Sequence, residues 1–600
     1  MYLRQNMHLK SINRYFIKYK SYLIWGMFFV IISNIFGLIP PIMIRYALDL
    51  ITENIETYQI LQGFSSKGLL YTSIIQLIFL FGILIIVSSL LRGIFMFFMR
   101  QTLIVMSRII EYDQKDELHQ QYQRLGSAFY KRNNTGDLMS RISEDVSKVR
   151  MYVGPAIMYA VNTLAMFIMV IYSMFYTNAY LSFWVLLPLP ILSYSIYKIS
   201  DSINKKSEAI QKQLSGITSM AQEYFSGIRV LKAFSREKFA GEEFEKASED
   251  YRVKTLALAR TEAFFAPLML LLIGLSTILA VYIGGIEVLR GRFSAGNIAE
   301  FVYYINMLTW PVASLGWVIS LIQRAEASQK RINEFMNQQP DIINPTESPL
   351  AQIGDIQFEN VSFTYPDTGI RALKDISFTI KKGQKIAIVG RTGSGKSTIA
   401  ELLLRSYDVR NGDITIDHQS LKKINLADLR TKTGYVPQDV FLFSETVLNN
   451  IRFGKMSADE TTVIKFAKIA SVHNDIMGLP NAYKTIVGER GVTLSGGQKQ
   501  RISIARALIK DPELLIFDDC LSAVDAKTEH VILNNFNTIL HEKTVLFITH
   551  RIFSLFNFDQ ILVLEDGALV ENGTHPQLME KKGVYYDLYQ IQQQEAEVVE

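Results

Sequence analysis

The sequence is poor in cysteine, with Cys520 the only one among 600 residues. A single cysteine excludes an intrachain disulfide and fits a domain kept in the reducing cytosol. The chain also lacks a strong excess of either charge: its formal net charge is +5, and its basic residues are spread over many polar loops. The small net charge and the wide spread of the basic residues argue against a surface that binds nucleic acid.

Hydrophobic residues make up 49% of the chain and charged residues 20%. The first value is high for a wholly soluble protein, and the second is too high for a chain buried entirely in lipid. A chain of 600 residues is also too long for one hydrophobic core. The composition therefore predicts a membrane part and a separate soluble part.

The first half contains six apolar runs of about 20 residues, the length that crosses the hydrocarbon of a bilayer. They cover residues 22–44, 69–91, 153–175, 180–199, 263–288 and 301–322. No Asp, Glu, Lys or Arg is expected at mid-depth in these spans, which argues against a proton or ion relay. Methionine and aromatic side chains within them could line an adaptable apolar cavity, although packing and lipid contact explain them more simply. Residues 1–322 are predicted to form a six-helix transmembrane domain.

Basic residues indicate which side of the membrane each loop occupies. Five basic residues and no acidic one precede the first apolar run, whereas the loop 49–68 holds one basic residue, Lys67. The N-terminus is therefore predicted to be cytoplasmic, with the long polar stretches 100–150 and 198–260 on the same side as helical extensions. Arg290 and Arg292, in a short outer loop, oppose this assignment. The length of the first run favours a retained span over a cleaved signal peptide.

Residues 323–353 read as a linker, and an α/β domain is predicted over 354–595. Its clearest motif is an apolar strand, 385–389, that leads through a glycine-rich loop into a helix. The loop consists of Gly390, Arg391, Thr392, Gly393, Ser394, Gly395, Lys396, Ser397 and Thr398. Strand, loop and helix in this order predict a phosphate-binding loop for ATP, in which Lys396 reaches the terminal phosphates and Ser397 ligates Mg²⁺.

Two further apolar strands end in polar residues that suit phosphate chemistry. The strand 514–517 leads into Asp518, predicted to coordinate Mg²⁺, and Asp519, placed where a general base for the attacking water would lie. The strand 544–548 leads through Thr549 to His550, which is predicted to hold the γ-phosphate or the water. Catalysis is therefore assigned to Asp519 and His550.

A second anion-binding motif precedes a basic helix and consists of Leu494, Ser495, Gly496, Gly497 and Gln498. A serine and two glycines at a helix N-terminus present backbone N–H groups to a phosphate. Together with the phosphate-binding loop, this motif makes the chain resemble an ABC (ATP-binding cassette) exporter that carries its membrane and nucleotide domains on one chain. Two phosphate sites in one domain imply that ATP is sandwiched between two copies of the domain.

The resemblance covers nearly the whole chain and implies a fold class: a six-helix exporter transmembrane domain, domain-swapped in a dimer, plus an α/β P-loop NTPase domain. It also implies that Tyr365 stacks on adenine and that Gln438 touches both ATP and Mg²⁺. Ser522 and Asp525 match the loop that communicates across the dimer, and residues 488–491 the segment that meets the inner loops. Residues 129–138 and 223–232 resemble the family's coupling helices.

The chain departs from its family at Asp519, where most active members carry glutamate. The carboxylate of Asp519 is one methylene shorter, and a displacement of about 1 Å at a catalytic group can cost about 100-fold in rate. We therefore expect weak hydrolysis at this site and a heterodimer in which a second half-transporter supplies the glutamate. A homodimer with two slow sites is the alternative, and His550 supports it.

The sequence thus predicts half of an ATP-driven exporter in a bacterial cell membrane, with the N-terminus and nucleotide domain cytoplasmic. Its expected partners are the lipid bilayer, a second half-transporter and an amphipathic small-molecule cargo, either drug or lipid. The remaining alternatives are a homodimeric lipid flippase with slow hydrolysis and a nucleotide-gated channel or regulator that transports nothing.

Overall fold

The computed structural model describes residues 8–60, 66–344, 349–488, 491–552 and 558–599. The chain forms two compact units: Met1–Tyr122 with Thr135–Gln338, and Gln123–Asn134 with Gln339–Glu600. A short internal segment, 123–134, therefore folds with the C-terminal half of the chain. Glu489 and Arg490, which belong to the segment expected to meet the inner loops, lie outside the described residues.

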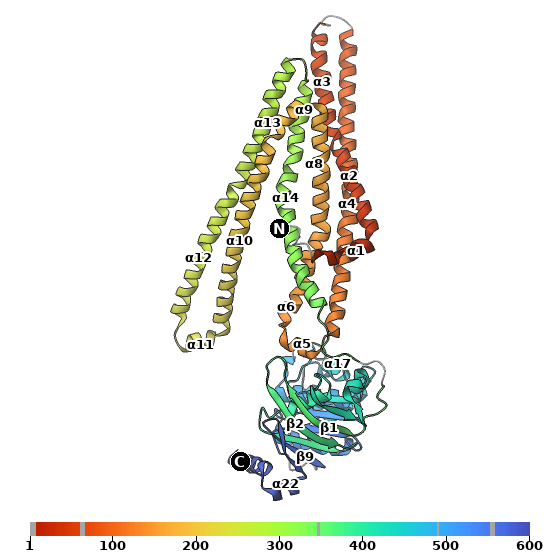
Figure 1. Cartoon of the computed structure of the whole chain (residues 1–600), viewed down its shortest axis with the longest axis vertical. Coiled ribbons are helices and arrows are strands. Elements are labelled where there is room, and N and C mark those ends of the chain that lie inside the picture. The colour runs from red at the N-terminus through yellow and green to blue at the C-terminus, as the bar shows by residue number, and fades with distance from the viewer. Residues whose placement is uncertain (1–7, 61–65, 345–348, 489–490, 553–557, 600) are drawn as a thin grey trace. The chain divides into compact units, whose positions relative to one another are not determined.

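The first unit is helical, and its described residues contain six helical stretches long and apolar enough to cross a membrane (Figure 1). They are Lys20–Ile60, Lys67–Arg124, Thr135–Thr177, Ala179–Ser226, Glu237–Leu289 and Ala295–Met336. Each is longer than the roughly 20 residues that a bilayer requires. The additional length comes from polar sequence without helix breakers, so the helices continue beyond their apolar parts.

Proline and glycine divide several of these stretches into separate helices. The first stretch consists of α2 (Lys20–Gly37) and α3 (Ile39–Ile60), and Pro40 and Pro41 lie in the first turn of α3, where a missing N–H costs no hydrogen bond. In the third stretch, Pro155 lies in a π-helical segment, Tyr152–Ala156. The other helices are α1 (Asn13–Lys18), α4 (Ser66–Arg124), α6 (Thr135–Ser140), α7 (Val146–Met151), α8 (Ile157–Thr177), α9 (Ala179–Leu186), α10 (Pro188–Ser226), α11 (Ile228–Ala233), α12 (Glu237–Ala263), α13 (Phe265–Leu289) and α14 (Ala295–Met336).

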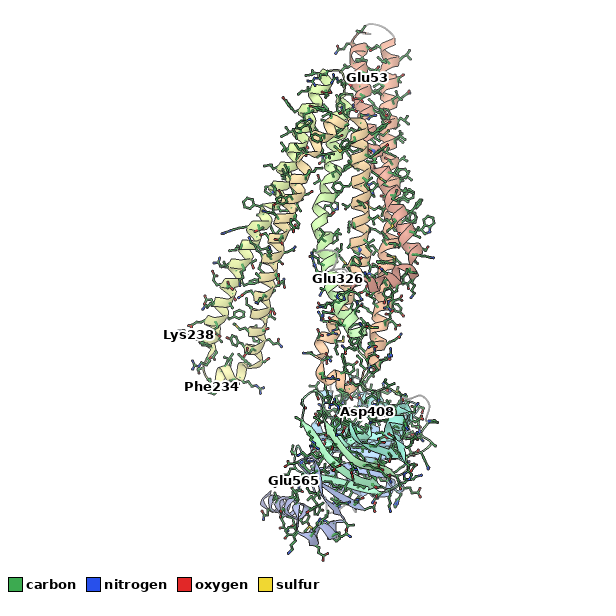
Figure 2. The ribbon with its side chains drawn as sticks, viewed as in Figure 1. Glu53, Phe234, Lys238, Glu326, Asp408 and Glu565 are labelled. Carbon is green, nitrogen blue, oxygen red and sulfur yellow. The ribbon has the colours of Figure 1, made fainter. Side chains whose placement is uncertain are left out.

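Helix α14 is the centre of the first unit and packs against α3, α8 and α13. Its buried Phe301 and Leu308 join Val170 of α8 and Leu181 of α9 in one apolar cluster. Helices α10 and α12 form an antiparallel pair that diverges from α8 and α14 toward α11 (Figure 1). Phe234 and Lys238 lie at the free end of this pair (Figure 2).

A charged residue, Arg92, packs against the first apolar run although it lies just beyond the second expected span, 69–91. The Ser33 hydroxyl donates to the carbonyl oxygen of Arg92 at 3.4 Å, and the Arg92 guanidinium lies over Gly37. Ser33 is at the centre of the apolar run 22–44, so Arg92 lies level with the centre of that run. The sequence search missed it because the second apolar run was counted only to Leu91, while the two helices pack with an offset. Elsewhere in the first unit, a charged pair of Arg45 and Glu300 at 3.1 Å joins α3 to α14.

The second unit contains two sheets. An antiparallel sheet has the order β2-β1-β4-β5, formed by β1 (Ile356–Thr364), β2 (Arg371–Ile380), β4 (Asn411–Ile416) and β5 (Gln419–Ser420). The second sheet has the order β10-β9-β3-β8-β7-β6, and its strands from β9 to β6 are parallel. It is formed by β3 (Lys385–Gly390), β6 (Thr433–Val436), β7 (Leu514–Asp518), β8 (Thr544–Ile548), β9 (Gln560–Glu565) and β10 (Ala568–Gly573).

The parallel sheet is covered on both faces, which explains why its strands are apolar without interruption. Along β7, Leu514 and Ile516 face a core shared with the antiparallel sheet and α15 (Lys396–Leu403). Leu515 and Phe517 face a second core. That core is formed with α17 (Val447–Arg452), α18 (Glu460–Ile469), α20 (Gly496–Leu508) and α21 (Ala526–Ile539).

The two segments expected to act as coupling helices differ in their surroundings. In the first, α5 (Ser127–Arg132) belongs to the second unit, where Ala128 is buried in the core and Lys131 Nζ lies 2.7 Å from Glu401 Oε1. The second segment forms the end of α10 and α11 in the first unit. Its neighbourhood exposes large apolar side chains, among them Phe225, Val230 and Phe234.

Candidate nucleotide-binding site

Four neighbouring parallel strands end at one edge of the second sheet. In the order β3, β8, β7 and β6, they lead into the glycine-rich loop, His550, Asp519 and Gln438. The carboxyl ends of parallel strands form the usual ligand crevice of an open α/β sheet. The topology therefore brings together residues that lie more than 150 positions apart in the sequence.

The glycine-rich loop joins β3 to α15. Gly395 is the N-cap of α15 with a φ of 95°, and a Cβ placed there would lie 2.3 Å from the carbonyl oxygen of Ala372. Glycine alone satisfies both the left-handed conformation and the close approach. Lys396 Nζ donates to the carbonyl oxygens of Gly390 and Arg391 at 2.8 Å each. Burial lowers the pKa of Lys396, and the nearby carboxylates of Asp519 and Asp518 oppose this effect.

Asp518 and Ser397 form a hydrogen-bonded pair beside the loop. The Ser397 hydroxyl donates to Asp518 Oδ1 at 2.9 Å, and Tyr435 contacts Oδ2 at 3.5 Å. Asp518 is 3% exposed, and this burial raises the pKa of its carboxyl group. A hydroxyl, a carboxylate and the amide oxygen of Gln438 in the same cavity are hard oxygen donors, so this set of residues fits Mg²⁺.

Asp519 is oriented toward His550. Its Oδ1 lies 3.0 Å from His550 Nδ1, and its backbone N–H donates to the carbonyl of Ile548 at 2.8 Å. Burial raises the pKa of Asp519, opposed chiefly by His550 and then by Arg551 and Lys396. The carboxylate therefore lies beside an imidazole and within the same cavity as Lys396.

The predicted residues around the loop share one cavity of about 490 Å³. The residues predicted from sequence that line it are Tyr365, Thr392, Gly393, Gly395, Lys396, Ser397, Thr398, Gln438, Asp518, Asp519 and His550. Gly390 and Arg391 contribute carbonyl oxygens to the loop, and the side chain of Ser394 is buried beneath it. The cavity thus contains cationic, carboxylate and imidazole groups within one pocket.

Sequence reasoning missed several residues that line this cavity. Arg371 and Lys374 come from β2, and Asp566 and Gly567 come from the turn between β9 and β10. The backbone N–H of Lys374 donates to the carbonyl of Gly567 at 2.7 Å, which joins the two sheets at this point. No motif marks these four positions. The spacing of basic residues along β2 could have suggested Arg371 and Lys374 only.

Tyr365 lies at the rim of the cavity, where adenine stacking was expected. Its hydroxyl donates to Glu401 Oε2 at 2.8 Å and lies 3.0 Å from Thr398 Oγ1, while its ring packs edge-on against Tyr407. Burial raises the pKa of Tyr365 well above its usual value. Lys131 of α5 lies 5.7 Å above the same ring. The ring is therefore fixed through its hydroxyl.

The second anion-binding motif is separate from this cavity, because the described lining includes none of residues 494–498. Ser495 caps α20 in a reciprocal pair: its hydroxyl accepts from the Gln498 backbone at 3.3 Å, and Gln498 Oε1 accepts from the Ser495 backbone at 3.0 Å. Gln498 also donates to Asp475 at 3.2 Å, and Leu494 is buried below. A Cβ at Gly497 would lie 2.7 Å from the carbonyl oxygen of Ala523, whereas one at Gly496 would meet only ordinary contacts.

Residues 522–525 connect the second motif to the catalytic strand ends. The Ser522 hydroxyl donates to the Asp519 carbonyl at 2.9 Å and accepts from Gln500 of α20 at 3.3 Å. Asp525 caps α21 by accepting from the Thr528 backbone at 3.0 Å, and this backbone hydrogen bond lowers the pKa of Asp525. A displacement of α20 would therefore move the backbone of Asp519 through the hydrogen bonds of Gln500 and Ser522.

The two units together define a class: a polytopic membrane protein with a P-loop ATPase unit on the same chain. Residues 23–312 match the family model described as the ABC transporter transmembrane region, and residues 373–522 match the family model described as ABC transporter. The chain belongs to the ABC transporter family, as an exporter that couples ATP hydrolysis to transport across the membrane.

Several relatives match nearly the full chain. It is 36% identical over 563 residues to a probable multidrug resistance ABC transporter ATP-binding/permease protein, YheI, of Bacillus subtilis, covering 93% of each chain. It is 34% identical over 570 residues to the multidrug resistance-like ATP-binding protein MdlA of Escherichia coli, covering 94% of this chain and 93% of that protein. An ATP-dependent lipid A-core flippase of Syntrophus aciditrophicus is 33% identical over 518 residues, covering 86% of each.

The fold also matches a solved structure. A bacterial Atm1-family ABC exporter with ATP bound superposes with a TM-score of 0.77 at 25% identity, covering 96% of this chain and 98% of that one. The expected fold class, a six-span exporter domain joined to an α/β ATP-binding domain, is confirmed.

Proposed function

We propose that the chain is one half of a dimeric exporter that moves amphipathic compounds, either drugs or lipids, from the cytoplasmic side outward by alternating access. The relatives support both cargo classes, because two are named for multidrug resistance and one as a lipid flippase. Within the chain, residues 1–322 apart from 123–134 would form the transport domain, and 354–595 together with 123–134 the ATPase domain, with 323–353 as the connection. The N-terminus and the ATPase domain would be cytoplasmic, in the cell membrane of a bacterium.

The separation of the two anion-binding motifs supports a dimer. In the second unit, Lys396 and Ser397 line the nucleotide cavity, whereas Ser495 does not. Binding ATP between two copies would let Ser495, Gly496 and Gly497 of one chain complete the cavity of the other. The exposed apolar side chains beside α11 fit a segment that packs on a partner's ATPase domain.

Within the nucleotide cavity each residue takes a distinct role. Lys396 and the backbone N–H groups of the loop hold the terminal phosphates, and Tyr365 supports the adenine. Ser397, Asp518 and Gln438 would hold Mg²⁺, which when bound supplies charge neutralisation for phosphoryl transfer. Asp519 orients and deprotonates the attacking water, and His550 fixes the carboxylate of Asp519 through the 3.0 Å contact.

Asp519 carries the proposal that the dimer is heterodimeric. A base must approach its water to within about 2.6–3.2 Å, and the shorter side chain of Asp519 withdraws the carboxylate from the position that a glutamate would reach. The contact with His550 holds it there. This site would therefore bind ATP with slow turnover, while the motif at Ser495 completes a faster site on the partner.

The test compares ATP hydrolysis by the purified chain alone with that of its Asp519→Glu variant in lipid nanodiscs. Slow hydrolysis by the wild-type chain is expected, with an increase of about 10-fold or more in the variant, since restoring about 1 Å of reach can change a rate by about 100-fold. The control is Asp511→Glu, which lengthens an exposed carboxylate on the same domain.

Rapid hydrolysis by the wild-type chain alone would contradict the weak-site proposal and favour the homodimer, which the retained contact between Asp519 and His550 also permits. Purification from the native membrane separates the two forms directly. Recovery of a second, different cassette chain supports the heterodimer, and recovery of this chain alone supports the homodimer.

A further inference from the structure

A cavity of about 510 Å³ lies within the first unit among α4, α8 and α14. Its lining residues follow one face of each helix, at 92, 96, 99 and 100 on α4, at 158, 159, 162 and 166 on α8, and at 303, 306, 307, 310 and 311 on α14. This spacing of three to four residues keeps each set on one side of its helix. The volume lies within the range of about 300–1,000 Å³ typical of small-molecule sites.

The wall of this cavity is mostly soft and apolar. Five methionines contribute to it: Met96, Met99, Met158, Met166 and Met307. Unbranched thioether side chains adapt to varied apolar shapes. Such a wall suits the hydrophobic body of an amphipathic compound and does not select for one shape.

Arg92 introduces a cation into this apolar wall. Its Nε is buried without a hydrogen-bond partner, and its guanidinium makes no hydrogen bond or ion pair to any residue that the structure describes. It lies level with Ser33 and Gly37, near the centre of the first apolar run. An unpaired charge among apolar spans is costly, and such residues are found where they face a functional cavity.

The other polar groups of the cavity also suit an anion. Asn162 Oδ1 already accepts from Asn34 Nδ2 at 3.1 Å, which leaves its own amide N–H groups to donate. The Tyr303 hydroxyl is a further donor in the lining. No aspartate or glutamate occurs among the described lining residues. The described lining therefore combines two guanidinium groups, those of Arg92 and Arg100, with neutral donors such as Asn162 and Tyr303, and it holds no carboxylate to neutralise them.

We propose that this cavity binds the anionic head of an amphipathic compound, a carboxylate, sulfonate or phosphate held by Arg92 and Asn162, with the apolar body against the methionines. A planar guanidinium pairs with such groups through two parallel hydrogen bonds. The proposal rests on the export function proposed above and narrows its cargo to anionic amphiphiles. The anion has two possible sources, a soluble compound or an anionic bilayer lipid.

The test measures equilibrium binding of two xanthene dyes of opposite charge, anionic fluorescein and cationic tetramethylrhodamine methyl ester. Fluorescence anisotropy is recorded without ATP, using the full chain with its native partner in phosphatidylcholine nanodiscs. Wild type is expected to prefer fluorescein. Arg92→Gln should weaken fluorescein binding by about 10-fold or more, the effect of losing a charged hydrogen bond, and should not weaken binding of the cation.

Three further variants test whether the loss of fluorescein binding depends on the charge and the donors of this cavity. Arg92→Lys should lose less fluorescein affinity than Arg92→Gln, because it keeps the charge but not the two parallel hydrogen bonds. Asn162→Ala should lose about 5-fold, as expected for one neutral hydrogen bond of about 1 kcal/mol. Arg108→Gln removes a charge from the same helix at a position 62% exposed and paired with Glu111, and it should change nothing.

Equal fluorescein affinity in wild type and Arg92→Gln would overturn the proposal, as would an equal loss for both dyes. If Arg92→Gln does not fold, the Asn162→Ala result decides in the same way.

Phosphatidylglycerol added to the nanodiscs separates the two sources of the anion. Competition with fluorescein identifies a bilayer lipid, and the absence of competition identifies a soluble amphiphile. Because binding is measured without ATP, it is independent of transport. A wild-type protein that binds fluorescein but drives no ATP-dependent dye movement would refute the export function and leave the anion site standing.

Discussion

Helices α15 and α20 both begin with a glycine-rich N-terminus in the same domain, yet they differ in what surrounds it. Gly395 caps α15 in a left-handed conformation and places Lys396 and Ser397 in the nucleotide cavity. Ser495 caps α20 in an extended conformation, and its hydroxyl is used by its own capping pair with Gln498. One helix end lies among lysine, carboxylate and imidazole groups, whereas the hydroxyl at the other end is occupied by its own cap.

This difference distinguishes a helix end that could take part in hydrolysis from one that could only bind a phosphate. The α15 end has Asp518 and Asp519 close to its loop, so it can hold both phosphate and metal. At the α20 end, Arg501 and Asp475 are paired with each other at 2.8 Å. Such an end stabilises an anion brought to it but cannot activate water. We propose that the two ends are complementary halves of one site and meet across a dimer.

Removing the cation at the α15 end should give the largest effect. Lys396→Ala is expected to weaken ATP binding by about 100-fold, because loss of one partner from a buried charged contact costs about 2–5 kcal/mol. Calorimetric titration with ATP measures this change. Lys381→Ala, at an exposed position before β3, is the control. Similar ATP affinities in both variants would show that Lys396 does not hold the phosphates.

Crowding the α20 end should leave ATP binding intact and reduce turnover in the dimer. In Gly497→Ala the new Cβ would lie 2.7 Å from the Ala523 carbonyl, which shifts the helix end relative to the loop that contacts Asp519. A misplacement of about 1 Å predicts about 100-fold slower hydrolysis. ATPase rates of the assembled transporter measure it. Gly496→Ala, whose Cβ would meet Ala523 at an ordinary 3.5 Å, should have a much smaller effect. An equal loss in both would show that space near Ala523 is not the cause.

The smallest predicted effect concerns the charge of Asp518. Because burial raises the pKa of this carboxyl group, its contribution to stability is present at acidic pH and is lost as pH rises through the folded-state pKa. At neutral pH in metal-free buffer, Asp518→Asn should therefore raise the melting temperature by a few degrees and abolish the further rise caused by Mg²⁺ and ATP. Thermal unfolding followed by differential scanning fluorimetry measures both quantities.

Asp525→Asn is expected to change the melting temperature in the opposite direction. A backbone hydrogen bond from Thr528 lowers the pKa of Asp525, so its ionised form is stabilising above its unfolded-state pKa, and that contribution is lost as pH falls. This variant should lower the melting temperature at neutral pH. A lower melting temperature for Asp518→Asn as well would show that its hydrogen bond with Ser397 outweighs the cost of its burial.

Much of this arrangement could be predicted from the sequence, because apolar strands that end in polar residues leave a local signal. The strand 385–389 and the glycines after it predicted the phosphate-binding loop, and the topology then brought Asp518 and His550 to the same cavity. The apolar runs predicted six spans, although the helices extend far beyond them. In α4, for example, polar residues without breakers continue the helix to Arg124.

What the sequence could not predict depends on contacts between distant segments. Arg371 and Asp566 reach the nucleotide cavity only because the two sheets meet at Lys374 and Gly567. The depth of Arg92 depends on the offset between α2 and α4, which no single apolar run records. Similarly, residues 123–134 lie in the polar loop between two spans, yet Ala128 is buried in the ATPase core.

The membership of 123–134 in the ATPase unit changes the connectivity of the protein. The chain passes between the two units three times, after Tyr122, after Asn134 and after Gln338. A domain attached by one linker is released by a single cut, but here a cut after Gln338 leaves the ATPase unit joined through a segment whose Ala128 lies in its own core. The ATPase unit is therefore completed by part of the membrane-spanning half of the sequence, and neither half is a self-contained piece of chain.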